Sequence, residues 1–206
     1  MSSLAISSIL GFLAGLLLLV RVLFHEERSP MRSALGWFLL AAAAECLIMA
    51  LLISPNISFA FSIELHRVRI LTMVIWSAAL LRFSLIYGRG DYAEVLRRWR
   101  IPLSVVTIAP PLVLLGSWYT VARVVWLEGN SSRPFLIQGF GGRAAGLLVI
   151  LLGILVLMNL ERTLRVSIGT MRWRLKYTVL GIGLFTVVRL FTATQELLHA
   201  TVVLSW

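Results

Sequence analysis

The sequence predicts an all-α polytopic membrane protein, and three observations lead to this class. The chain has 206 residues, of which 59% are hydrophobic and only 14% charged, whereas a soluble domain is about half apolar and a quarter charged. The mean hydropathy is +0.93. Apolar segments of the length that crosses a bilayer recur along the chain without a long soluble segment between them. We therefore expect one transmembrane domain over residues 1–206, built as a bundle of six helices.

Six segments meet the length requirement of a spanning helix, at 1.5 Å per residue. We expect them at 4–24, 34–53, 69–87, 101–119, 143–160 and 177–199. The first resembles a signal peptide, but it lacks a basic leading region and another span follows almost at once, so we interpret it as a transmembrane helix. Its Gly11 and Gly15 are four residues apart, which marks either close helix packing or a chance spacing.

The basic residues predict the orientation. The formal net charge is +10, from 19 basic and 9 acidic residues. In a soluble protein this balance would indicate a nucleic-acid partner. Here the arginines lie in short loops between apolar spans, so the positive-inside rule explains them and we expect no nucleic acid. Loops one, three and five hold 13 basic residues and loops two and four hold 5, which places the first set in the cytoplasm and both termini outside.

Two charged residues, Glu45 and Arg189, lie near the middle of predicted spans. Both helices run from inside to outside. Glu45 follows Ala34 by eleven residues and Arg189 follows Tyr177 by twelve, so their depths differ by about 1.5 Å. Each charge alone costs about 2.5–3.5 kcal/mol at mid-membrane, and a pair neutralises both. We expect Glu45 to contact Arg189. The alternative is that Arg189 snorkels or pairs with Glu196 on its own helix, while Glu45 stays protonated.

Polar residues also gather at the two ends of the predicted bundle. The outer polar cluster consists of Glu64, His66, Arg67, Gln195, Glu196 and His199. Such a cluster can sense pH or bind an anion, or it forms a solvated collar on helix three. The inner basic-aromatic collar consists of Arg162, Arg165, Arg172, Trp173, Arg174 and Lys176. These residues suit the anionic headgroups of a lipid bilayer, and they also determine topology.

The loops and prolines predict three local features. Residues 88–100 combine aromatic side chains with Arg97, Arg98 and Arg100, which is typical of an interfacial helix. Pro110 and Pro111 predict a kink in span four, because each removes a backbone hydrogen bond. Residues 120–142 predict a turn at 128–134 and a flexible glycine-rich return, an arrangement compatible with a short hairpin.

The sequence holds no recognisable catalytic or metal-binding motif. Cys46 is the single cysteine, so neither a disulfide framework nor a multi-cysteine metal site can form within the chain. No H-E-x-x-H or G-x-S-x-G pattern occurs, and we expect no metal and no other cofactor. Residues 25–30 match the H-E-x-x-x-P pattern of a phospho-accepting histidine. They lie in a short loop between two spans, without a dimerisation helix or nucleotide-binding glycines, so we interpret the match as chance.

The last fifty residues carry an ordered set of polar motifs. Asn-Leu-Glu-Arg-Thr-Leu-Arg occupies 159–165 and Arg-Trp-Arg-Leu-Lys occupies 172–176. Leu180-Gly181 and a polar end around Arg189 and Gln195 follow. This order resembles the membrane region of PrsK sensor histidine kinases, which are associated with the bacterial PEP-CTERM/exosortase system. The first 150 residues match that family only as an array of spans.

The resemblance implies a two-component signalling protein of the bacterial inner (cytoplasmic) membrane, crossing it several times. It also implies further spans, a cytoplasmic sensory domain and a kinase core. The given chain stops at Trp206 without a dimerisation helix or ATP-binding glycine boxes. We therefore expect no kinase domain within it and assign no catalytic residue to it.

Two classes of function follow. The first is a signal-transduction module that passes a membrane or periplasmic signal to a kinase core in cis or in trans, with a homodimer as a further partner state. The alternative is a small transporter, channel or scaffold subunit. Transport needs polar residues that converge from several helices at mid-membrane, and only Glu45 and Arg189 lie at that depth.

The predicted orientation can be tested with reporter fusions. Fusions at Trp99 and Ser167 should behave as cytoplasmic and a fusion at Asn130 as periplasmic, because the basic loops remain inside. A cytoplasmic reporter signal at Asn130 would refute the six-span arrangement. With both termini outside, a cytoplasmic kinase core after Trp206 needs an odd number of additional spans.

Overall fold

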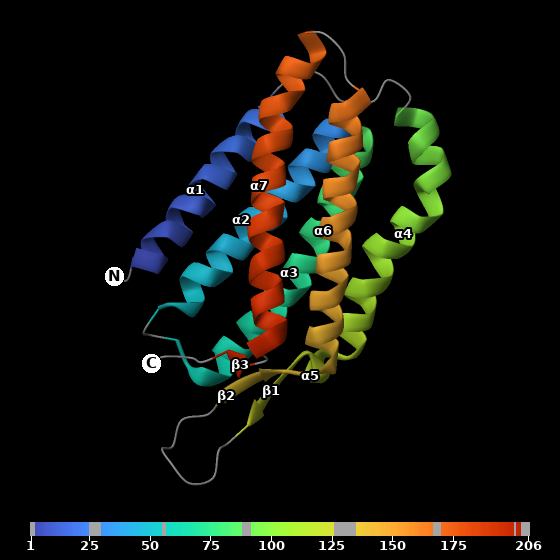
Figure 1. Cartoon of the computed structure of the whole chain (residues 1–206). Helices are drawn as coiled ribbons and strands as arrows, with labels where there is room; N and C mark the ends of the chain where they lie inside the picture. The colour runs from blue at the N-terminus through green and yellow to red at the C-terminus, as the bar shows by residue number, and fades with distance from the viewer. Residues whose placement is uncertain are drawn as a thin grey trace.

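The computed structural model describes residues 3–24, 30–54, 57–87, 92–125, 135–166, 170–199 and 201–202. It shows a bundle of long helices with a small antiparallel sheet at one end (Figure 1). The long helices in chain order are α1 (Ser3–Phe24), α2 (Pro30–Leu52), α3 (Phe59–Ile86), α4 (Tyr92–Gly116), α6 (Phe140–Val166) and α7 (Thr170–His199). The helical class predicted from the sequence is therefore confirmed.

The sheet lies between the end of α4 and the end of α7. A short helix, α5 (Trp118–Val121), leads into β1 (Ala122–Val125), which pairs antiparallel with β2 (Phe135–Gln138). This pairing is the hairpin that the glycine-rich loop predicted. β3 (Thr201–Val202) adds to the other edge of β2, so the residues after α7 are tied to the loop between α4 and α6. The predicted turn at 128–134 lies outside the described residues.

The helix at the centre of the bundle is α3. It packs against α2, α4 and α6, and its Val74, Leu80 and Phe83 are almost fully buried. Side chains on nearly all of its faces are apolar, which is typical of a helix enclosed by others. The surrounding helices bury one face and leave large apolar residues such as Leu17 and Leu151 exposed. An exposed apolar exterior of this kind suits a lipid environment.

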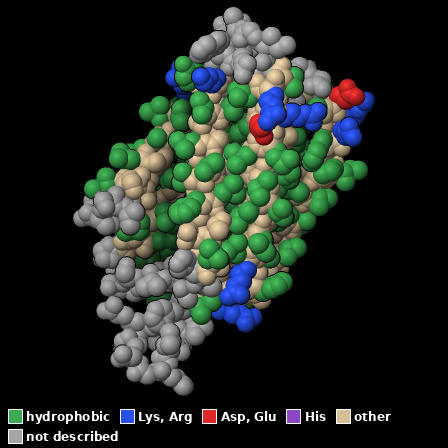
Figure 2. Space-filling view, in the orientation of Figure 1, with side chains coloured by type: hydrophobic (Ala, Val, Ile, Leu, Met, Phe, Trp, Pro, Cys, Tyr) green, Lys and Arg blue, Asp and Glu red, His purple; other side chains and the backbone are tan. Residues whose placement is uncertain are grey.

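Within the described residues, five helices are long and apolar enough to cross a membrane: α2, α3, α4, α6 and residues Lys176–Leu198 of α7. In α1 the shorter stretch Ile6–Val22 is apolar and helical. Figure 2 shows a broad apolar band between two ends that carry the charged side chains. The chain therefore has the build of a multi-pass membrane protein.

The third helix begins ten residues before the predicted span 69–87. It begins at Phe59, where the Ser58 side chain accepts a hydrogen bond from the Phe61 backbone N–H and so caps the helix. The sequence predicted a short apolar loop over residues 54–66, between spans two and three. The charged side chains of Glu64, Arg67 and Arg69 have partners in the structure, as described below, so the helix can contain them.

The fourth helix also differs from its prediction. Residues 92–100 do not form a separate interfacial helix but are the first turns of α4, which continues to Gly116. Pro102, Pro110 and Pro111 all lie inside it. Figure 1 shows the ribbon of α4 bending away from the bundle, as expected where proline removes hydrogen bonds of the helix.

Glycines set the spacing at two helix contacts, α1 with α2 and α6 with α7. A Cβ atom on Gly11 would lie 3.2 Å from Cys46 Sγ, and one on Gly15 would lie 3.1 Å from Ala43 Cβ. Gly11 and Gly15 therefore mark close helix packing, as one of the two interpretations of the sequence predicted, and the helix that packs against them is α2. On α6, a Cβ on Gly146 would meet Leu197 at 3.1 Å, and one on Gly153 would meet Leu190 at 2.8 Å. The two glycines and the two leucines are each seven residues apart, so α7 fits against α6 at two successive sites.

The glycines after β2 do not act as a flexible return. A Cβ on Gly139 would lie 1.9 Å from the Thr120 carbonyl oxygen, and one on Gly142 would lie 2.5 Å from the Val121 carbonyl oxygen. The Gly139 N–H donates to Val121 O at 3.1 Å. These positions need glycine because two backbone segments cross in contact.

Gly153→Val should loosen the contact between α6 and α7. The added side chain has to displace Leu190, at a cost of about 1–3 kcal/mol in unfolding free energy. Gly181→Val is the matched control, because no atom lies within 4 Å of a Cβ there. Thermal unfolding in detergent, followed by circular dichroism, measures both. Equal losses for the two variants would contradict this close packing.

Candidate functional site

The predicted contact between Glu45 and Arg189 is present in the structure. Arg189 donates from Nη2 to Glu45 Oε1 and forms an ion pair that joins α7 to α2. The Glu45 side chain is 7% exposed and that of Arg189 is 21% exposed. Glu45 lies seven residues before the end of α2 at Leu52, a rise of about 10 Å. The pair is therefore inside the apolar part of the bundle, toward the end that carries the sheet.

An aromatic group holds the arginine from the other side. The Arg189 guanidinium lies over the Trp76 ring of α3, with Cζ 5.2 Å from the ring centroid. Trp76 in turn meets Phe38 of α2 and Phe185 of α7 edge to face, at centroid separations of 6.2 and 5.6 Å. A cation over an indole is stabilised by the ring quadrupole, more so away from water. Arg189 is therefore contacted by both α2 and α3.

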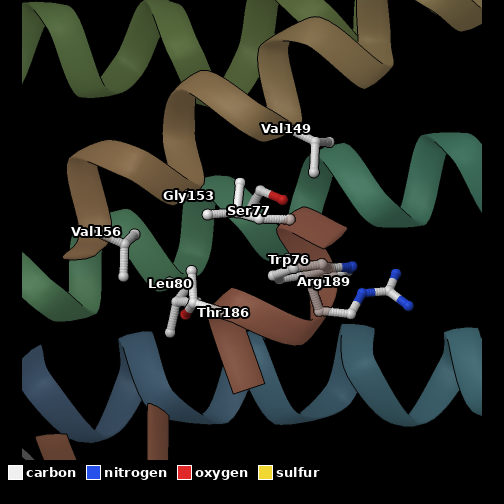
Figure 3. Close-up of a pocket in the computed structure, with 9 residues that line it drawn as sticks. Trp76, Ser77, Leu80, Val149, Gly153, Val156, Thr186 and Arg189 are labelled. Carbon is white, nitrogen blue, oxygen red and sulfur yellow. The ribbon is translucent and has the colours of Figure 1, made fainter. Parts of the chain in front are cut away.

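A small cavity separates this arginine from α6. Its volume is about 10 Å³, and its walls include Trp76 and Ser77 of α3, Gly153 of α6 and Thr186 of α7. Figure 3 shows Trp76 and Arg189 side by side at one end, with the guanidinium directed away from the other labelled side chains. A cavity of this size holds at most one water molecule. It gives no passage for an ion or solute at this depth.

A second ion pair lies two helical turns further along α7. Arg69 of α3 contacts Glu196 at 2.9 Å from Nη2 to Oε2, and its Nη1 lies 3.6 Å from Met49 Sδ of α2. The side chain of Arg69 is 6% exposed. Gln138 of β2 donates from Nε2 to the same Glu196 oxygen at 3.4 Å. This second contact therefore joins α7, α3 and the sheet.

The two ion pairs form a polar ladder, which we define as Glu45, Arg189, Arg69 and Glu196. Arg189 and Glu196 are seven residues apart, so they share one face of α7 at a separation of about 10 Å. The carboxylate comes from α2 in the first pair and from α7 in the second. Two positive and two negative groups cancel, so α7 attaches to α2 and α3 without a net buried charge.

The other residues of the predicted outer polar cluster separate from the ladder. Arg67 contacts Glu64 at 2.6 Å, donates to the Ala122 carbonyl at 3.2 Å and lies over the Tyr119 ring. The Trp118 indole N–H donates to Glu64 at 2.8 Å. These contacts attach α3 to α5 and β1. The single cluster expected from the sequence is thus two groups on two faces of α3.

His66, Gln195 and His199 are the remaining residues of the predicted cluster. His66 is 3% exposed, and neither of its ring nitrogens has a hydrogen-bond partner among the residues that the structure describes. Gln195 lies on α7 and is partly buried. The side chain of His199 lies outside the described residues. The interpretation of His66 as a solvated surface residue is therefore wrong, because the residue is buried, while the response of the cluster to pH stays a prediction.

The inner basic-aromatic collar lies at the opposite end of the bundle. Arg162 and Arg165 are exposed near the end of α6, and Arg165 pairs with Glu161 one turn before it. Lys176 is exposed on α7. Residues 172–174 are helical in α7, and their side chains lie outside the described residues. Part of the collar therefore belongs to the first turns of α7. This helix begins at Thr170, seven residues before the predicted span.

Sequence reasoning missed Gln138 and Trp76. It placed Arg69 beside Glu64, His66 and Arg67 at the outer end of span three but did not predict its pairing with Glu196. The spacing of seven between Arg69 and Trp76 puts both on one face of the helix. The sequence could not predict the contact of Gln138 with Glu196, because this contact depends on how the strands pair. No family model, no curated protein and no solved structure matches the chain. The resemblance to sensor histidine kinases therefore stays a prediction.

A double-mutant cycle measures the Glu45–Arg189 coupling. Glu45→Gln leaves an arginine that cannot lose its charge, so it should cost about 2.5–3.5 kcal/mol of unfolding free energy. Arg189→Gln should cost less, because Glu45 can then become protonated. The double variant should cost clearly less than the sum of the two.

The exposed pair Glu161–Arg165 is the matched control for this cycle. Its side chains are 59% and 77% exposed, so the same exchange to Gln at both positions should show almost no coupling. Unfolding in mixed micelles measures both cycles. Additive losses at Glu45 and Arg189 would show that the two residues do not interact.

Proposed function

We propose that the chain is a membrane sensory module that passes a signal from its sheet-bearing end to its basic end through a shift of α7. The single observation that supports this best is the polar ladder. Its second pair is bonded to Gln138 of the sheet, and its first pair lies about 10 Å further into the bundle. A change at the sheet can therefore reach the interior along one helix face.

The packing of α7 favours a movable helix. Its backbone lies closest to α6, where Gly146 and Gly153 receive two leucines. Toward α2 and α3 the contacts that join α7 to the bundle are made by long side chains, Arg189 and Glu196 among them. The buried ion pairs of the ladder can be rearranged only by an exchange of partners that leaves no charge unpaired, whereas close-packed glycine contacts cannot be remade in this way. The ladder is thus the part of the α7 interface that a signal can rearrange.

The proposed topology has six spans, with α1 as the first and both termini outside. The ends of α3, α6 and α7 that lie away from the sheet hold Arg82, Arg162, Arg165 and Lys176, and the start of α4 holds three further arginines. This excess of positive charge supports a cytoplasmic location for that end. The sheet then faces the outside, where a periplasmic or membrane signal acts.

The receiver that fits this arrangement is a cytoplasmic kinase core, in cis or in trans, in the inner membrane of a bacterium. The support for a kinase is the resemblance of residues 159–176 and 180–195 to PrsK proteins. A transporter is less well supported. The cavity beside Arg189 measures about 10 Å³, and the ladder charges are paired with each other.

Distance measurements between spin labels test the proposal. Cys46→Ser removes the single cysteine, and new cysteines replace Trp37 of α2 and Tyr177 of α7, both exposed. Gln138→Ala and Glu196→Gln at the sheet end should shift the distance between these labels by at least about 1–2 Å, the scale of helix shifts in signalling proteins.

Glu161→Gln is the control for this experiment, because its exposed ion pair lies outside the ladder. It should leave the distances unchanged. Unaltered distances in all variants would mean that α7 does not transmit a change, and solute uptake by proteoliposomes containing the chain would favour a transporter instead.

A further inference from the structure

A cavity opens between α3 and α4 at the end of the bundle away from the sheet. Its volume is about 520 Å³. Arg82 of α3 and Arg97 and Arg100 of α4 line it, together with the apolar side chains of Leu96, Leu103 and Ile108. It therefore combines three positive charges with an apolar wall.

The three arginines are not neutralised by the protein. Among the side chains that the structure describes, none of them takes part in a salt bridge. Arg82 lies four residues before the end of α3 and Arg97 five residues after the start of α4. Because α3 and α4 are adjacent along the chain and pack against each other, the two charges lie at a similar depth. Their combined field favours an anion in the cavity.

The length and polarity of the wall fit one lipid leaflet. Along α4 the lining runs from Ala93 to Ile108, fifteen residues or about 22 Å of helix. One leaflet including its headgroups is about 20–22 Å thick. Arg97 and Arg100 lie in the part near the helix start, and Leu103 and Ile108 lie deeper. Ser104 and Thr107 also line this deeper part, so beyond the arginines the wall is partly apolar, and Leu103 and Ile108 are the side chains that can contact an acyl chain.

The cavity is accessible from the bilayer. Within α4, the buried side chains are those of Leu103 and Leu114. The side chains of Ile101 and Val105 are 76% and 56% exposed. A lipid can therefore enter sideways without any rearrangement of the core.

We propose that this cavity binds an anionic phospholipid, with the phosphate on Arg82, Arg97 and Arg100 and an acyl chain along Leu103 and Ile108. A smaller cleft of about 360 Å³ on the other side of α4 holds Arg98, Trp99 and Arg162. That cleft lacks an apolar wall of comparable depth, so we assign the lipid to the α3–α4 cavity. The site does not depend on the signalling proposal.

Native mass spectrometry of the purified chain in detergent tests the site, with phosphatidylglycerol as the probe and phosphatidylcholine as the uncharged comparison. The triple variant R82Q/R97Q/R100Q should bind phosphatidylglycerol roughly a hundredfold more weakly. R21Q/R123Q/R143Q removes the same charge from exposed positions outside the cavity and should retain binding. Equal losses of phosphatidylglycerol binding in both triple variants would show that the lipid is held by a general attraction to the charged surface, and would overturn the proposal.

A second pair of variants tests the apolar half without altering charge. Ser104 lines the cavity, so Ser104→Trp should fill it and abolish binding, whereas Val105→Trp on the exposed neighbouring position should not. Circular dichroism checks that both variants are folded. Millimolar inorganic phosphate should not displace the lipid. Displacement by free phosphate, or full binding in Ser104→Trp, would show that the acyl chain has no part and would overturn the proposal.

Discussion

The cost of placing charge inside an apolar bundle governs this structure. An arginine side chain keeps its positive charge, so Arg189 needs a negatively charged partner, either on its own helix or on a neighbouring one. Glu45 on α2 is that anion, and Trp76 on α3 adds its ring face. The position of α7 relative to α2 and α3 follows from this requirement. Apolar packing alone is non-directional and would allow several rotations of α7 about its axis.

Two kinds of contact hold α7, and they differ in stiffness. On one face, Leu190 and Leu197 fit against glycines of α6 at close range. On the adjacent face, Arg189 and Glu196 reach across to α2 and α3 with long side chains. The first kind fixes the axis of the helix, while the second can be remade with other partners. The axis of α7 is therefore fixed by close packing against α6, while its polar contacts with α2 and α3 depend on the pairing of charges.

The two ends of the bundle have opposite chemical character. At the end with the sheet, Glu64, Arg67 and Gln138 have ion-pair or hydrogen-bond partners. At the other end, Arg82, Arg97 and Arg100 line an open cavity between α3 and α4 and have no salt-bridge partner among the side chains that the structure describes. The charges of Glu64 and Arg67 are therefore paired at the sheet end, whereas those around the cavity can attract an anion.

The sequence alone determined the membrane class, the approximate spans, the packing role open to Gly11 and Gly15, and the pairing of Glu45 with Arg189. These follow from rules that act along one helix: apolar length, glycine spacing, and the depth of a charge at 1.5 Å per residue. Only the tertiary structure decided that Glu196 belongs to Arg69, that the outer cluster divides in two, and that His66 is buried. These facts depend on the rotation of α3 and on strand pairing, and a rotation about a helix axis leaves no trace in hydropathy when nearly every face is apolar.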